Sequence, residues 1–284
     1  MSDINPNSNN EHKKVSEETR SPLNTFIEVY KASVHKAHNP LIKTFLLGIV
    51  AGAFIGIAYI ASIWATRNMQ GQAMYNVIFG LVFLVAITMI IFMGGEMFTS
   101  NSLMFIPVIK KHVKWRRMFA NLFVVLMGNF IGGALFGLLT WGAGFLKDSA
   151  FLSNAYSIAE HKLETSWYNN FFSAIICNIL VAGSLYITCA TKSSIAKFAL
   201  MAMLIFPFAL SGFSHVVANS YPWTLLPIFN LFKGYHTTFG DWGKFGYSVQ
   251  LPTLFGNFIG GAIFLMGFYY LIFRKDLKKI NIEL

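Results

Sequence analysis

Apolar and polar residues are arranged along the chain in long blocks rather than in alternation. Six blocks stay apolar for about 20 residues, the length that an α-helix needs to cross the hydrocarbon core of a bilayer. They lie near residues 41–65, 74–93, 118–141, 169–191, 198–219 and 251–273. Gly94 and Gly95 break the second block, which resumes to about residue 109, and Pro207 with Ser211–Gly212 interrupts the fifth. The pattern predicts an all-α integral membrane protein with six transmembrane helices, of which helices 2 and 5 are broken.

The segments that flank these blocks are polar. Residues 1–20 are rich in Asn, Ser, Glu and Lys, have no apolar region typical of a cleavable signal peptide, and are expected to form a disordered tail. Residues 21–38 show helical spacing of apolar positions, which predicts an amphipathic helix at the membrane surface. Those positions are Leu23, Phe26, Ile27, Tyr30 and Val34. The six-span domain is expected over 39–275, followed by a short tail, 276–284.

The composition supports a membrane protein and excludes other classes. Of the 284 residues, 55% are hydrophobic and only 12% are charged, whereas a soluble domain carries about 25% charged residues. If both termini are cytoplasmic, the inside segments hold 17 of the 22 Lys and Arg residues. This bias predicts that orientation for a multi-pass protein of the cell inner (plasma) membrane. The basic run KKHVKWRR, residues 110–117, therefore reflects topology, and nucleic acid is not an expected partner.

Signals for metal binding and catalysis are weak. Cys177 and Cys189 are twelve residues apart, which is about 18 Å along a helix and too far for a disulfide. The GFSHV segment lacks the GxSxG pattern of hydrolases, and no strand–helix unit surrounds GNFIGGA, as a dinucleotide site would require. No metal, no cofactor and no catalytic residue is therefore expected, and a membrane enzyme is the least favoured class.

The heptapeptide GNFIGGA occurs twice, at 128–134 and at 256–262. Each copy lies in the late span of a three-span half, so the two halves would cross the membrane in opposite senses. Such inverted repeats place their binding sites near the midplane, on broken helices. The two breaks are GGEMFTSN, residues 94–101, and SGFSHVVAN, residues 211–219. The small residues of the heptapeptide also permit close helix packing, which is the simpler explanation for most of its glycines.

Three side chains near these breaks are candidates for a substrate pathway. His215 lies within an apolar run, and histidine is the residue type whose ordinary pKa is near neutrality, which favours a functional over a purely structural role. Thr99, in the opposite break, could pass a proton onward or could bond only its own backbone. Lys162, just before the fourth span, could concentrate anions in a vestibule or simply pair with Glu160 or Glu164.

Several of these motifs, in this order, resemble the formate/nitrite transporter family over roughly residues 22–273. The resemblance rests on NPLIKTFLLGIVAGAFIGIA in the first span, GGEMFTSN in the second, AEHKLETSW with CNILV at the fourth, FALSGFSHVVAN in the fifth and GNFIGGA in the sixth. It implies a homopentamer of six-span protomers with an aquaporin-like fold and one pore each. The pathway residues that it implies are His215, Thr99, Lys162, Asn178 and Asn257.

The same resemblance implies constrictions and gating positions. Bulky aromatic residues near the breaks could narrow a pore, although packing is the default role in a chain with 29 Phe. The constriction positions are Phe83, Ile87 and Phe208. The gating candidates, in the broken second span, are Phe98, Ser100 and Asn101.

The chain departs from the family pattern at three positions. The family commonly has Glu before the central histidine, as GFEH, where this chain has Ser214. Ala182 stands where the fourth span usually has Cys, and Met97 replaces a usual Leu. The missing acidic neighbour of the histidine leaves the choice of substrate open.

Three transport functions fit the sequence. The first is a passive, pH-dependent channel for small monovalent anions of weak acids, such as formate, nitrite, hydrosulfide or lactate, which cross as anion or neutral acid. The second is a proton-coupled, alternating-access transporter of the same substrates, which inverted repeats support equally well. The third is an aquaporin-like channel for neutral solutes, which the lack of NPA motifs disfavours. Accumulation against the substrate gradient, beyond what the pH gradient predicts, would distinguish the second from the first.

Overall fold

The computed structural model describes residues 19–278, and within that range the chain is helical without a strand. Only an isolated bridge between Thr19 and Thr191 has β pairing in this range. In chain order the α-helices are α2 (Pro22–His38), α3 (Leu41–Thr66), α4 (Tyr75–Met93), α5 (Phe98–Asn101), α6 (Phe105–Ile109), α7 (Trp115–Gly142), α8 (Ser149–Glu164), α9 (Trp167–Thr188), α10 (Ser194–Leu210), α11 (Ser220–Phe229), α12 (Phe239–Lys244), α13 (Leu251–Ile259) and α14 (Phe268–Leu277). Short 3-10 or π segments are η1 (Ser102–Met104), η2 (Phe145–Lys147), η3 (Phe245–Gln250) and η4 (Gly260–Gly267).

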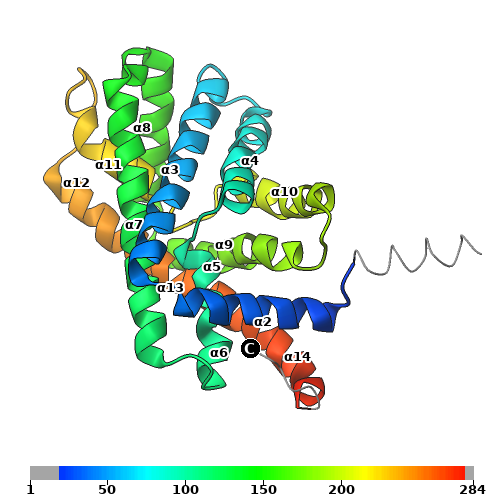
Figure 1. The fold of residues 1–284 in the computed structure, drawn as a ribbon. Helices are drawn as coiled ribbons and strands as arrows, with labels where there is room; N and C mark the ends of the chain where they lie inside the picture. The colour runs from blue at the N-terminus through cyan, green and yellow to red at the C-terminus, as the bar shows by residue number, and fades with distance from the viewer. Residues whose placement is uncertain (1–18, 279–284) are drawn as a thin grey trace, which may run out of the picture.

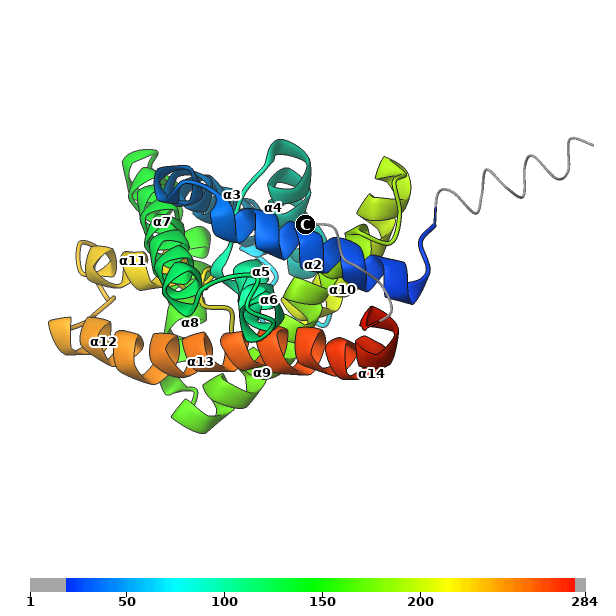
Figure 2. The same ribbon diagram turned by 60° about the horizontal axis from the view of Figure 1, so that its bottom comes forward.

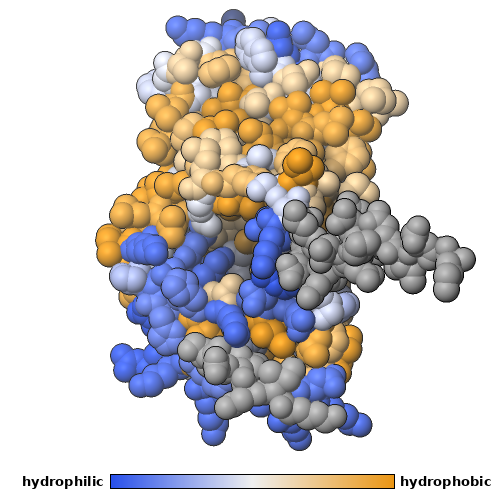
Figure 3. All heavy atoms as spheres, turned by 45° about the vertical axis from the view of Figure 1, so that its right-hand side comes forward, coloured by the Kyte–Doolittle hydropathy of each residue, from blue (hydrophilic) through white to orange (hydrophobic). Residues whose placement is uncertain are grey.

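Five helices in the described part of the chain are long and apolar enough to cross a bilayer. They are α3, α4, α7, α9 and the continuous 39-residue helix Phe239–Leu277, which comprises α12 to α14. Figure 3 shows a broad apolar band on the molecular surface, with polar groups gathered at the two ends. The chain is therefore a multi-pass membrane protein, as the apolar blocks predict. The last helix begins twelve residues before the predicted block because the aromatic and glycine-rich stretch 239–250 is helical although it is not uniformly apolar.

Two apolar segments are interrupted. α4 ends at Gly94, whose φ of +95° is a left-handed backbone conformation that favours glycine, and the chain becomes helical again at Phe98. α10 ends at Leu210, Gly212 has φ of +64°, and the helix resumes at Ser220. The prediction that Pro207 interrupts this segment is wrong, since α10 runs through Pro207 and ends one turn later. Neither interrupted segment is therefore a single long helix.

Close packing between helix backbones organises both halves of the chain. α3 runs beside α7 (Figure 1), and α9 packs on α13 (Figure 2). Gly132 of α7 faces the Ile49 carbonyl of α3, and Gly260 faces the Ile175 carbonyl of α9, with no room for a Cβ at either place. These glycines let the helices approach to backbone contact, as small residues do in membrane proteins.

α2 runs across the lower part of the molecule in Figure 1, below α9 and above α6 and α14. Its N-terminus is capped by the Ser21 side chain, and its buried face includes Phe26, Val29 and Tyr30. The Arg117 guanidinium donates to the carbonyl oxygens of Ala37 (2.6 Å) and Asn39 at the other end of α2. α2 is therefore fixed to the membrane domain at the point where the chain enters α3.

We predict that Gly132→Ala destabilises the protein. The added Cβ would meet the Ile49 carbonyl, so α3 and α7 must move apart, at a cost of about 1–3 kcal/mol. The matched control is Gly142→Ala, because the Cβ there meets no atom within 4 Å. Thermal unfolding of the detergent-solubilised protein should show a lower midpoint for the first variant only. Equal midpoints would contradict the packing role of Gly132.

Candidate functional site

The first break is held by Asn129 of α7, which belongs to the first copy of GNFIGGA. Its side-chain oxygen accepts the Phe98 N–H (3.0 Å), and its amide nitrogen donates to the carbonyls of Gly48 (2.9 Å) and Glu96 (2.8 Å). Peptide groups freed by a helix break inside a membrane need partners from the protein, because lipid supplies none. One side chain thus satisfies two groups of the break and ties them to α3.

Asn257, in the second copy of the motif, makes the same three bonds at the second break. It accepts the Val216 N–H (2.9 Å) and donates to the carbonyls of Ala174 (2.8 Å) and Ser214 (3.1 Å). The repeated heptapeptide therefore supplies more than small residues for packing. Through these three bonds, which we call a clamp, its asparagine fixes the backbone of each break to the first long helix of the same half.

The residues that follow the two breaks also correspond. The Ser102 hydroxyl donates to the Thr99 carbonyl (2.6 Å), and the Ser220 hydroxyl donates to the Val217 carbonyl (2.6 Å). Each residue of the second pair comes 118 positions after its counterpart, which is also the separation of Phe98 and Val216. The two breaks therefore share a local backbone arrangement although their sequences differ.

His215 and Thr99, one from each break, meet in the interior. The His215 Nε2 atom lies 3.3 Å from the Thr99 hydroxyl oxygen, and both residues are buried. The Ala218 N–H donates to His215 Nδ1 (3.0 Å). Since a backbone N–H can only donate, Nδ1 carries no proton, and the neutral ring has its hydrogen on Nε2. Nε2 then donates to Thr99, whose own hydroxyl hydrogen is left for another acceptor.

Asn178 of α9 holds the backbone on the other side of Thr99. Its amide nitrogen donates to the Thr99 carbonyl (3.1 Å), the Ser102 hydroxyl (3.3 Å) and the Asn257 carbonyl. Both predicted pathway asparagines thus lie beside the His215–Thr99 pair. Asn178 bonds to the carbonyl of Thr99, and Asn257 bonds to the backbone on both sides of His215.

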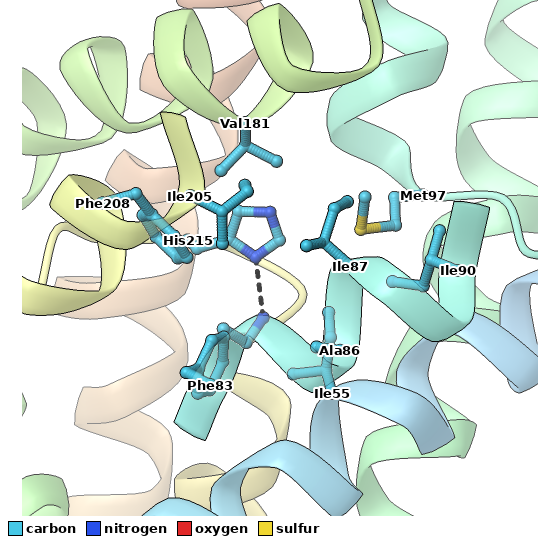
Figure 4. A pocket seen from close by; sticks show the side chains of 11 residues that line it. Ile55, Phe83, Ala86, Ile87, Ile90, Met97, Val181, Ile205, Phe208 and His215 are labelled. Atoms are coloured by element: carbon cyan, nitrogen blue, oxygen red, sulfur yellow. Dashed lines mark hydrogen bonds between the residues drawn. The ribbon is translucent and has the colours of Figure 1, made fainter. Parts of the chain in front are cut away.

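The three predicted constriction residues, Phe83, Ile87 and Phe208, line one small cavity together with His215. Its volume is about 20 Å³, which is room for about one water molecule. The rings of Phe83 and Phe208 are 6.2 Å apart edge to face, and Phe208 lies 5.6 Å from the His215 ring. Figure 4 shows the imidazole surrounded by apolar side chains, and its dashed line is the bond to the Ala218 N–H. The other lining residues are Ile55, Ala86, Ile90, Met97, Val181, Ile205 and Ala218.

The gating candidates lie in a buried polar cluster between the first break and α2. The Asn101 amide donates to one Glu96 oxygen (2.8 Å), and the Asn39 amide donates to the other (3.0 Å). The Lys36 ammonium lies 3.4 Å from both Asn101 and Ser100. Burial lowers the pKa of Lys36, and the nearby Glu96 carboxylate opposes that shift. The third candidate, Phe98, is buried and anchored through its N–H to Asn129.

Lys162 lies in the last turn of α8 and is not among the residues that line the cavity. The ion pairs within residues 19–278 are Arg20–Glu28 and Arg67–Asp148, so neither Glu160 nor Glu164 pairs with it there. Burial lowers the pKa of Lys162 to about 8. Its charge is close enough to act on Cys177 and on His215.

The sequence patterns did not single out Asn129, Glu96 or Lys36, and they marked Met97 only as a departure from the family pattern. Asn129 could have been found, because it is the counterpart of Asn257 in the repeated heptapeptide. Lys36 and Glu96 are 60 positions apart, and no spacing pattern links them. Met97 is one of many apolar residues, and only its place in the break directs it toward the cavity.

These features define a class of protein. Helices that cross the membrane enclose two interrupted segments, and the interruptions meet at a buried histidine and threonine beside a narrow apolar cavity. Interrupted helices that meet inside a bundle are typical of membrane transport proteins. The chain belongs to the formate/nitrite transporter family, whose profile matches residues 24–271. The resemblance found in the sequence motifs is thereby confirmed.

Known proteins of this family are similar over nearly the whole chain. The formate channel FocA of Haemophilus influenzae is 26% identical over 272 residues, covering 89% of this chain and 94% of that protein. FocA of Escherichia coli strain K12 is 25% identical over 265 residues, covering 87% and 92%. A solved pentameric formate channel with formate bound is 26% identical, with a TM-score of 0.73 over 82% of this chain and 98% of that one. An FNT family ion channel, 24% identical with a TM-score of 0.75, shares the fold.

We predict that Asn257→Asp destabilises the protein. The carboxylate can still accept the Val216 N–H, but it places an oxygen against the Ala174 and Ser214 carbonyls, which lose their donor. Two buried acceptors without partners cost about 2 kcal/mol or more. The control Asn169→Asp changes an exposed side chain at the start of α9. A thermal midpoint of the Asn257 variant equal to that of the control would disprove the clamp.

Proposed function

We propose that the protein is a channel for small monovalent anions of weak acids, with formate as its first candidate substrate. The single observation that carries the proposal is the contact between His215 and Thr99 beside a narrow apolar cavity. Formate channels among its relatives, one of them pentameric with formate bound, support the substrate and a homopentamer with one pore per protomer. The membrane channel acts without chemical conversion of its substrate, so we assign no enzymatic role.

We infer that the chain crosses the plasma membrane six times as two inverted three-helix repeats, an aquaporin-like arrangement with both termini cytoplasmic. The equivalent clamps of Asn129 and Asn257 support this topology, as does the constant separation of the residues at the two breaks. In this arrangement α4 with α5–α6 is one crossing, and α10 with α11 is another. The breaks then lie opposite one another near the midplane, where transporters of this design place their substrate.

An anion entering this pathway meets a favourable charge and then an apolar barrier. Lys162 is the cation that draws the anion toward the entrance, and burial strengthens its field by keeping water away. The side chains of Phe83, Ile87 and Phe208, which form a slit beside His215, are apolar. Carrying a bare charge through it would cost several kcal/mol. A proton from bulk water on the entry side removes that cost by converting the anion to its neutral acid.

His215 and Thr99 orient the substrate at the slit. Because His215 Nδ1 is occupied by the Ala218 N–H, the ring is held neutral and its Nε2–H fixes the Thr99 oxygen. The Thr99 hydroxyl hydrogen then points to a substrate oxygen, and no charge remains buried after the substrate leaves. At the far side, α2 and the cluster of Lys36, Ser100 and Asn101 form the gate.

The test is tracer flux in proteoliposomes for formate, nitrite, hydrosulfide and lactate, with the pH on each side varied separately. We predict flux that follows the weak-acid gradient without accumulation beyond it. His215→Asn should reduce formate flux about tenfold, the loss expected for one hydrogen bond of roughly 1.4 kcal/mol. His161→Asn, at an exposed site on α8, is the control. No flux of any solute through folded protein refutes the channel, and a His215 variant that transports like wild type at every pH refutes the histidine's role.

The lowered pKa of Lys162 predicts a specific pH dependence. The lysine loses its charge as the outside pH rises through about 8, whereas an arginine stays charged at every pH used. The ratio of wild-type to Lys162→Arg formate flux should therefore stay constant below pH 7 and fall up to about tenfold by pH 9. The concentration of free acid also falls as the pH rises, but its effect on the flux is the same for both proteins and cancels in the ratio. A ratio constant from pH 6 to pH 9 would show that Lys162 does not supply the attracting charge.

A further inference from the structure

The backbones of the two breaks correspond at further positions. The Asn101 N–H donates to the Met97 carbonyl (3.0 Å), and the Asn219 N–H donates to the His215 carbonyl (2.9 Å). Both pairs keep the separation of 118 positions found for the other bonds at the breaks. Asn219 is therefore the counterpart of Asn101, and the two side chains start from equivalent backbone positions.

In the first break a carboxylate satisfies this asparagine. The Asn101 amide donates to Glu96 (2.8 Å), and the Asn101 oxygen faces the Lys36 ammonium at 3.4 Å. A negative group, an amide and a positive group thus lie next to one another, and Asn39 donates to the second carboxylate oxygen (3.0 Å). Such an arrangement balances the buried charge and leaves each polar group with a partner.

In the second break the carboxylate is missing. Ser214 is the counterpart of Glu96, because the Glu96 carbonyl accepts from Asn129 and the Ser214 carbonyl accepts from Asn257. The Ser214 hydroxyl is short and donates to the Asn170 side chain (2.7 Å). Among the described residues, neither the nitrogen nor the oxygen of the Asn219 side chain has a hydrogen-bond partner, although Asn219 is 0% exposed. A fully buried amide without partners is rare, because it loses its hydrogen bonds to water and gains none in return.

The positive group has a counterpart as well. The end of α8 lies 126 positions after the end of α2, and the start of α9 lies 126 positions after the start of α3. Lys36 and Lys162 are also 126 positions apart, and each directly follows a histidine. The same separation relates Gly48 to Ala174, whose carbonyls accept equivalent bonds from Asn129 and Asn257. Lys162 also has no carboxylate partner within residues 19–278, whereas Glu96 lies near Lys36. By position in the chain, the second half therefore has counterparts of the amide and of the cation, whereas Ser214 stands where the first half has the Glu96 carboxylate.

We propose that a small monovalent anion binds beside Asn219, in the place that the Glu96 carboxylate occupies in the other half. The anion accepts a hydrogen bond from the Asn219 amide, and the Lys162 ammonium balances its charge. The short Ser214 side chain makes room for it. A carboxylate such as formate matches the group that it replaces in charge and in its two acceptor oxygens. This subsite rests on the proposed function, because it would be the point where the transported anion waits before the slit.

The test is thermal unfolding of the purified full-length protein in detergent, with sodium formate replacing sodium gluconate at constant ionic strength. Formate should raise the unfolding midpoint of the wild type along a saturating curve. Ser214→Glu supplies the missing carboxylate from the chain itself, so it should abolish the formate-dependent shift or raise the half-saturating concentration at least tenfold. Ser214→Ala keeps the space open and is the matched variant, and its formate-dependent shift should remain.

The opposite results would overturn the subsite. An unchanged formate response in Ser214→Glu places the bound anion elsewhere, and the absence of a saturating shift in the wild type means that water alone satisfies Asn219. If Ser214→Glu does not fold, the anomalous signal of bromide in wild-type crystals decides. A peak within hydrogen-bond distance of the Asn219 amide supports the proposal, and no peak there refutes it. Formate flux that persists while this binding is absent refutes the subsite alone and leaves the channel intact.

Discussion

Interrupted helices inside a membrane must have their free peptide groups bonded by the protein itself, and the rest of this structure depends on how that is done. Two asparagines, Asn129 and Asn257, satisfy this requirement with the same three bonds each. Each asparagine ties a break to the first long helix of its own half. With both breaks tied in this way, the His215 ring meets Thr99 across the interior.

The second constraint is the cost of a charge in an apolar slit. The cavity beside His215 is lined almost entirely by hydrocarbon, and the imidazole is held neutral by the Ala218 N–H. Charged groups lie near the ends of α2 and α8 instead: Lys36 is close to Glu96, whereas Lys162 has no carboxylate partner among residues 19–278. A positive charge with no partner attracts an anion, whereas a compensated one does not. The two halves therefore share the backbone arrangement of their breaks but differ in charge, and the proposed attraction of the anion rests on this difference.

The sequence predicts the parts of this design that leave a local signal. Glycines within apolar runs locate the first break, and a histidine among apolar residues identifies the site, because both are costly in a membrane helix. Contacts between residues far apart in the chain, such as Asn39 with Glu96, leave no such signal. The start of the last helix at Phe239 was also not predicted, since its first twelve residues follow no apolar pattern. The prediction of Pro207 as an interruption failed because a proline near a helix end removes only one bond.

The central claim is that the substrate passes the slit beside His215 as a neutral acid. The most direct measurement follows formate and protons together in proteoliposomes that contain a pH-sensitive dye, with the membrane potential clamped at zero and then at a negative value. The account predicts that one proton enters with each formate and that the flux does not change with the potential. Formate entry without acidification, carried as an electric current that the potential drives, would contradict it.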